Sequence, residues 1–191
     1  MMKNKKVAVL VSGGGTNLQA LIDSGIEISL VISSKKDAYA LTRAAKNGIA
    51  AVVTEWADYR PERELFSRKI LEILLEHSID LVVYAGFMVI LSDCVCKAFP
   101  NAMLNVHPSL IPAFCGEGYY GLKVHKAALE RGVKLSGATV HFVNDVCDGG
   151  PIIMQKAVEV HDDDTPETLQ ARVMQVEREI LPLAVKRLIG E

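Results

Sequence analysis

Short runs of apolar residues are the feature that most limits how this chain can fold. Residues 7–11, 28–33 and 81–85 have the length of strands and are mostly or wholly apolar. Such runs are typical of parallel strands that helices cover on both faces. Segments that begin near Leu18, Ala38 and Pro61 have helical patterns, and residues 50–54 suit a further short strand. We therefore expect an α/β fold with a Rossmann-like, mostly parallel twisted sheet.

The C-terminal part of the chain adds two more strands and a long helix to this expectation. Residues 136–143 alternate in strand fashion, and residues 152–160 make a last strand. Thr165, followed by a proline and a glutamate, is the expected N-cap of an amphipathic helix over residues 169–189. There is no repeat, low-complexity tract or linker, so we expect residues 1–191 to form one domain.

The composition argues against several classes of protein. The 191 residues are 50% hydrophobic and carry a formal net charge of −2, which does not suit a nucleic-acid or anionic-membrane surface. The start, residues 1–6, is basic, but the apolar run after it is too short for a signal peptide, and no run is long enough to cross a bilayer. We expect a cytoplasmic protein.

No metal site is expected. Cys94 and Cys96 form a C-x-C without a second pair, and Cys115 and Cys147 stand alone, so reduced thiols are the default. The acidic run 162–164 precedes a helix, where carboxylates favour the helix dipole.

A glycine-rich turn follows the first strand. Residues 12–17 read Ser-Gly-Gly-Gly-Thr-Asn, and a helical pattern starts directly afterwards. Strand, glycine loop and helix together present free backbone N–H groups to a phosphate. The spacing fits neither a dinucleotide fingerprint nor a P-loop, so the phosphate of a small nucleotide fits better. The alternative is a tight turn that binds nothing.

The segment Asn-Val-His-Pro-Ser-Leu, residues 105–110, carries the strongest chemical signal. The apolar run 102–104 leads into it, and Pro108 cannot continue a strand ladder. Asn105 can donate to a developing oxyanion, and His107 can move a proton near neutral pH. Alone, the two side chains could simply mark a turn. The Asp-Gly-Gly turn that begins at Asp148 supplies a carboxylate to orient the imidazole, and no serine or cysteine is placed as a nucleophile. This trio suits acyl transfer by direct attack of a substrate amine.

Four segments resemble the glycinamide ribonucleotide formyltransferase family, which uses 10-formyltetrahydrofolate in purine biosynthesis. They occur in family order and read VAVLVSGGGTNLQ, AGFMVILS, NVHPSLIP and TVHFVNDVCDGGP. The resemblance covers nearly the whole chain. It implies a formyltransferase fold in which the N-terminal half binds the nucleotide and the C-terminal half binds the folate.

The resemblance also implies roles for particular residues. Asn105, His107 and Asp148 match the catalytic trio, and His141 matches a secondary family histidine. Gly15, Thr16, Asn17 and Glu177 match the ribonucleotide site. The folate co-substrate is expected at Arg63, Met88, Val89, Ile90, Leu91, Asn105, Val143, Asn144 and Asp145.

Two departures and two rival functions accompany this resemblance. Val89 stands where some relatives have an arginine, and residues 114–121 make a longer, more aromatic segment than the family pattern. The loop 112–121 that contains this segment has the make-up of a mobile lid. A formyltetrahydrofolate hydrolase would carry an extra N-terminal domain, and a methionyl-tRNA formyltransferase a C-terminal one; neither is expected here. Hydrolysis of the folate and a non-catalytic nucleotide-binding module are the rivals.

Small-molecule substrates are the expected partners, without nucleic acid or membrane, and both a monomer and a homodimer fit the sequence.

Overall fold

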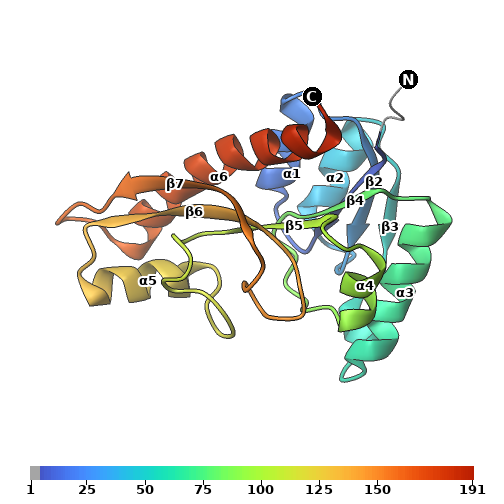
Figure 1. The fold of residues 1–191 in the computed structure, drawn as a ribbon, viewed down its shortest axis with the longest axis horizontal. Coiled ribbons are helices and arrows are strands. Elements are labelled where there is room, and N and C mark those ends of the chain that lie inside the picture. Colours follow the sequence, from blue (N-terminus) through green and yellow to red (C-terminus); the bar gives the residue numbers. More distant parts are fainter. Residues whose placement is uncertain (1–4) are drawn as a thin grey trace.

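The computed structural model describes residues 5–191, so only part of the basic start at residues 1–6 lies within it. Seven strands form one twisted sheet in the order β3-β2-β1-β4-β5-β6-β7 (Figure 1). The five strands from β3 to β5 are parallel, whereas β6 and β7 are antiparallel to their neighbours. The strands are β1 Val7–Val11, β2 Ile28–Ser33, β3 Ala51–Val53, β4 Leu81–Tyr84, β5 Met103–His107, β6 Leu135–Phe142 and β7 Ile152–Glu159.

Helices cover both faces of the sheet, and each face has its own apolar core. Helices α1, α2 and α6 lie over one face, and α3 and α4 lie over the other (Figure 1). Their buried side chains belong to two separate apolar clusters. This arrangement explains why β1 and β4 are buried along their whole lengths. The helices are α1 Thr16–Asp23, α2 Tyr39–Lys46, α3 Arg63–Glu76, α4 Asp93–Ala98, α5 Leu122–Arg131 and α6 Pro166–Ile189, with a short 3-10 helix η1 at Trp56–Tyr59.

The start of α6 carries the N-cap that the sequence predicts. The hydroxyl of Thr165 accepts a hydrogen bond from the backbone N–H of Thr168, whose own hydroxyl accepts from the Thr165 N–H. This reciprocal capping box satisfies two N–H groups at the helix start. Gly190 ends the helix in the left-handed conformation, at φ 88°.

The order of the parallel strands reverses direction between β1 and β4. The chain runs outward from β1 through β2 to β3, then returns to place β4 on the other side of β1. The loops after β1 and β4 therefore leave the same end of the sheet side by side. In open α/β sheets, ligands bind at such a switch point.

The expected α/β class and mostly parallel sheet are confirmed, and the structure refines two details. The 3-10 helix η1 was not predicted. The strand β5 runs to His107, so Asn105 and His107 lie within the strand and not in the turn after it. No helix within residues 5–191 is long and apolar enough to span a membrane.

Candidate active site

Asn105 and His107 lie on one face of β5, because side chains two positions apart in a strand point the same way. Met103 on that face packs in the core beneath α3 and α4. The antiparallel register places His141 of β6 opposite Asn105 and Thr139 opposite His107. The sheet thus brings an amide and two imidazoles together on one surface.

Asp148 completes this group from the turn after β6. Its backbone is left-handed, at φ 54°, an uncommon conformation for a residue with a side chain. A Cβ at Gly150 would lie 1.8 Å from the carbonyl oxygen of Phe142, so only glycine permits this close return of the chain. The Asp-Gly-Gly sequence is therefore what folds the carboxylate back over β5.

The Asp148 carboxylate contacts each of the other polar groups of the site. Its Oδ1 lies 3.4 Å from Nδ2 of Asn105 and 3.6 Å from Nε2 of His141. Its Oδ2 lies 3.4 Å from Nδ1 of His107 and accepts a 2.9 Å hydrogen bond from the N–H of Gly116. Burial disfavours the charged carboxylate, but hydrogen bonding from His141, the charge of His107 and the Gly116 N–H outweigh it. The pKa of Asp148 consequently lies below its usual value.

Both ring nitrogens of His107 face acceptor groups. Its Nε2 lies 2.9 Å from the carbonyl oxygen of Phe114, which can only accept, so Nε2 must carry a proton. Its Nδ1 faces the Asp148 carboxylate, and only a proton on Nδ1 makes that contact attractive. A buried imidazolium next to an amide can stabilise an oxyanion.

The loop of residues 112–121 contacts His107 and Asp148 through the Phe114 carbonyl and the Gly116 N–H, two backbone contacts that the sequence does not predict. His125 of α5 is buried, with 1% of its surface exposed. Burial, with a smaller effect of the charge on His107, lowers the pKa of His125 to about 4. Backbone groups leave no signal in a sequence, but the glycines of the loop mark where the chain can approach closely.

The predicted ribonucleotide residues also come together. The amide Nδ2 of Asn17, at the start of α1, donates to Oε2 of Glu177 on α6 at 2.9 Å. Burial raises the pKa of Glu177, although the Asn17 hydrogen bond opposes the shift. Gly15 is left-handed, at φ 69°, and an added Cβ would lie 2.7 Å from the Cβ of Ala40. The glycine loop, with Thr16 as the first residue of α1, therefore lies against α2 with its form fixed by packing.

The predicted folate residues divide by exposure. Met88 and Ile90 are 56% and 49% exposed, whereas Val89 and Leu91 are buried among apolar side chains from α3 and α4. The side chains of Val89 and Leu91 are thus part of the core rather than of an open surface. Arg63 is exposed at the start of α3. A hollow of about 440 Å³ is lined by Asp93, Cys96, Lys97, Pro100, Asn101, Phe142, Val143, Asn144, Asp145 and Pro151.

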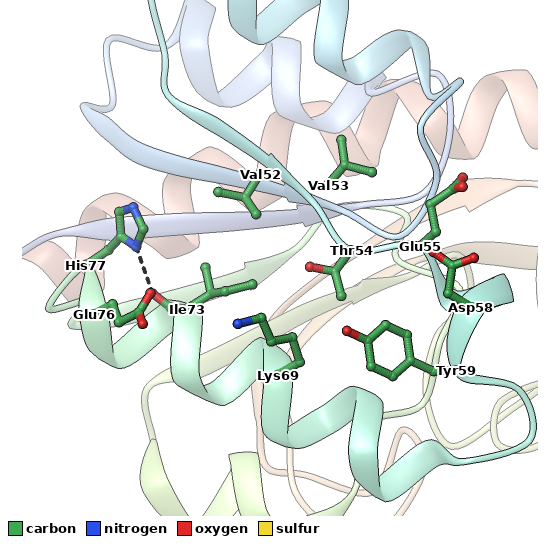
Figure 2. Close-up of a pocket in the computed structure, with 10 residues that line it drawn as sticks. All are labelled: Val52, Val53, Thr54, Glu55, Asp58, Tyr59, Lys69, Ile73, Glu76 and His77. Atoms are coloured by element: carbon green, nitrogen blue, oxygen red, sulfur yellow. Dashed lines mark hydrogen bonds between the residues drawn. The ribbon is translucent and has the colours of Figure 1, made fainter.

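Another hollow, of about 340 Å³, lies away from all these residues, between β3 and α3 (Figure 2). Two of the charged side chains that line it are already paired: Glu55 lies 3.3 Å from Lys36, and Lys69 lies 2.9 Å from Glu72. At one end, Nδ1 of His77 lies 2.8 Å from the carbonyl of Ile73 (Figure 2). No predicted site residue lines this hollow, so we assign it no part in the chemistry.

The four cysteines are free thiols. Burial raises the pKa of Cys96 and Cys115, and raises that of Cys147 to about 11, with the charge of Asp148 adding to the last two shifts. The thiols of Cys96, Cys115 and Cys147 are therefore protonated near neutral pH and are weak nucleophiles. Within residues 5–191, no group of three or more histidine, cysteine or acidic side chains is placed to hold a metal ion.

Comparison with known proteins shows the family of this chain. A family model described as formyl transferase matches residues 5–185. The chain belongs to the formyl transferase family. It is 40% identical to phosphoribosylglycinamide formyltransferase of Haemophilus influenzae, over 95% of this chain and 86% of that protein. The chloroplastic enzyme of Arabidopsis thaliana is also 40% identical, over 93% of this chain.

The chain spans 63% of the Arabidopsis relative and only 18% of the chicken trifunctional purine biosynthetic protein. Among solved structures, glycinamide ribonucleotide transformylase 1 from Symbiobacterium toebii superposes with a TM-score of 0.90 at 41% identity. That match covers 97% of this chain and 88% of the other. The resemblance and the formyltransferase fold predicted from the sequence are confirmed.

Proposed function

We propose that this family member transfers a formyl group from 10-formyltetrahydrofolate to the amine of glycinamide ribonucleotide. The products are N-formylglycinamide ribonucleotide and tetrahydrofolate, in de novo purine biosynthesis. The names of the similar proteins support this activity. The observation that carries the proposal is the shared carboxylate of Asp148, which joins Asn105, His107 and His141 next to the switch point of the sheet.

The acceptor is assigned to the glycine loop and α6. The N–H groups around Gly15, Thr16 and Asn17 would bind the ribonucleotide phosphate at the start of α1. Glu177, held by Asn17, would accept hydrogen bonds from the ribose hydroxyls. Burial makes these charge-assisted hydrogen bonds stronger than they would be at the surface.

The donor is assigned to the loops after β4 and β6. Met88 and Ile90 would present apolar side chains to the folate, Val89 and Leu91 would contribute backbone groups, and the exposed Arg63 a positive charge. The backbone of Val143, Asn144 and Asp145 would pair with the polar edge of the pteridine. Asn105 would contact the formyl group itself.

In the reaction, the acceptor amine attacks the formyl carbon directly. The formyl oxygen becomes negative, and the Asn105 amide and the charged His107 ring stabilise it. Asp148 keeps His107 charged and correctly turned, and it orients a water that carries the amine proton to N10. The bond between the formyl carbon and N10 then breaks, which leaves a formamide on the acceptor and N10–H on tetrahydrofolate. No covalent intermediate with the protein and no metal is needed.

An assay of folate release with and without glycinamide ribonucleotide tests this proposal. We expect a spectrophotometric signal for deformylated folate only when the ribonucleotide is present. Release without it would replace the transferase with a formyltetrahydrofolate hydrolase. No release under either condition, with ribonucleotide binding intact, would leave only a nucleotide-binding module and refute the roles of Asn105, His107 and Asp148.

We also propose a cytoplasmic location and no nucleic-acid or membrane partner, in keeping with the net charge of −2. Two of the plant relatives are named as chloroplastic, so compartment varies among similar proteins. Cell fractionation with an antibody to the chain tests the location, and recovery with membranes would contradict it. The oligomeric state, monomer or homodimer, is a question for sedimentation.

A further inference from the structure

Ser12, the residue directly after β1, has a hydroxyl in an unusual place. Its side chain is buried, and its Oγ lies 2.6 Å from the Oγ of Ser34, just beyond β2. The same oxygen accepts a 2.9 Å hydrogen bond from the backbone N–H of Met88. One hydroxyl therefore joins the ends of β1 and β2 to the loop that follows β4.

The position of Met88 gives this contact its importance. Backbone pairing between β1 and β4 ends with the hydrogen bond from the N–H of Ala85 to the carbonyl of Leu10. Gly86 then turns the chain away, at φ 74°. Within residues 5–191, the bond from Met88 to Ser12 is the hydrogen bond that ties segment 86–91 back to β1.

The two segments that Ser12 connects are assigned to different substrates. Gly13, Gly14 and Gly15 follow Ser12 immediately and form the loop proposed for the ribonucleotide phosphate. Segment 86–91 forms the wall proposed for the folate. A transfer between two bound molecules needs the reacting atoms at about 3–3.5 Å and correctly aligned, so the spacing of these two segments matters for the rate.

We propose that Ser12 is a positioning residue that sets the folate loop against the ribonucleotide loop through the N–H of Met88. This inference rests on the proposed function. It goes beyond it because Ser12 touches neither reacting group and acts only through the two loops. The competing interpretation is that the Ser12–Ser34 pair merely stabilises the sheet.

Ser34 provides a matched control, because it shares the buried pair but not the contact with Met88. In Ser34→Ala, the Ser12 oxygen can still accept the Met88 N–H. In Ser12→Ala, that N–H loses its acceptor. A purely structural pair predicts equal effects of the two variants, whereas positioning predicts an effect of Ser12→Ala alone.

Steady-state kinetics of both variants, with each substrate varied in turn, tests the proposal. For Ser12→Ala, we expect kcat/KM for the folate donor to fall about tenfold, equivalent to about 1.4 kcal/mol. The KM for the ribonucleotide should change less than about twofold, because the glycine loop keeps its own contacts with α2. Ser34→Ala should stay within about threefold of the parent in every constant. Equal losses in the two variants would overturn the proposal.

Hydrogen exchange of segment 86–91 gives a readout that does not depend on turnover. Exchange should become faster in Ser12→Ala and stay unchanged in Ser34→Ala, and unchanged exchange in both would also overturn the proposal. If Ser12→Ala does not fold, Ser12→Cys supplies a weaker acceptor of similar size and should show an intermediate loss. Lack of turnover by the parent protein would refute the proposed function instead, and the exchange comparison would still judge the Met88 contact.

Discussion

At the residue scale, Asp148 is the group on which the proposed chemistry depends. Its carboxylate contacts two histidines, an amide and a backbone N–H, so it is both the orienting and the charge-balancing element. Because its pKa is lowered, it stays ionised at neutral pH. The stability it contributes is present above its unfolded pKa of about 3.9 and is lost as pH falls through the lower folded value.

Asp148→Asn should therefore reduce kcat far more than it weakens ribonucleotide binding. The amide keeps the shape but leaves His107 without a negative partner, and we expect kcat to fall about 10²–10⁴-fold. The Kd for glycinamide ribonucleotide, measured by calorimetry, should change little, because Asn17 and Glu177 lie elsewhere. Equal losses in kcat and affinity would contradict the catalytic assignment.

Gly15 and Gly14 offer a second test at this scale. Gly15→Ala forces a side chain into a left-handed residue, which costs about 1–2 kcal/mol, and places its Cβ against Ala40. Gly14→Ala meets nothing within 4 Å and has no positive φ. We expect Gly15→Ala alone to lower the midpoint of urea unfolding and to abolish ribonucleotide binding. Similar behaviour of the two variants would show that the loop tolerates a side chain.

At the element scale, most of the fold could be predicted because each strand and helix has a local signal. Apolar runs located β1, β2 and β4 to within a residue, and Thr165 followed by a proline located the start of α6. The 3-10 helix at Trp56–Tyr59 has no such pattern, because the rings of Trp56 and Tyr59 instead pack against Phe66 of α3. The antiparallel pairing of β5 with β6 is a long-range property that no local pattern contains.

The buried His125 of α5 should make the free energy of unfolding depend on pH. His125 has a folded pKa of about 4 and an unfolded value near 6.5, so the unfolded chain binds the proton more readily between these values. The free energy of unfolding should therefore fall as pH drops from 6.5 to 4, by about 2 kcal/mol after allowance for solvent screening. His125→Gln should flatten this slope in urea titrations. Parallel slopes in the parent and the variant would exclude His125 as the cause.

The start of α6 makes another prediction at this scale. Thr165→Ala removes the hydroxyl that caps the helix, and we expect a loss of about 1 kcal/mol in the free energy of unfolding. Thr165→Ser keeps the hydroxyl and should retain most of the stability. Urea denaturation measures both, and a loss in Thr165→Ser as large as that in Thr165→Ala would mean that the cap is not responsible.

At the scale of the whole molecule, the site is assembled from segments far apart in the chain. Asn17 and Glu177 are 160 residues apart, and Asn105 and Asp148 are 43 apart. The chemistry of Asn105, His107 and Asp148 predicted that these three would meet, whereas the pairing of Asn17 with Glu177 was implied only by the family resemblance. The sequence did not predict that Val89 and Leu91 point into the core, or that the Phe114 carbonyl holds His107, because these features depend on packing and on backbone groups.

Binding of the acceptor should protect two distant segments together. Glycinamide ribonucleotide is expected to slow hydrogen exchange in residues 12–17 and in α6 around Glu177, because both would contact the same molecule. The hollow between β3 and α3 serves as an internal control and should not respond. Protection of only one of the two segments would contradict the shared ribonucleotide site.

The strand β5 has a parallel neighbour on one side and an antiparallel neighbour on the other. Asn105 and His107 therefore lie on the strand where parallel pairing changes to antiparallel pairing, and Asp148 reaches them from the antiparallel side. The groups proposed to recognise the acceptor come from the first loop and α6, and none of them lies on β5. A substitution in the first loop or in α6 therefore changes the groups proposed for the acceptor and leaves the side chains of β5 in place.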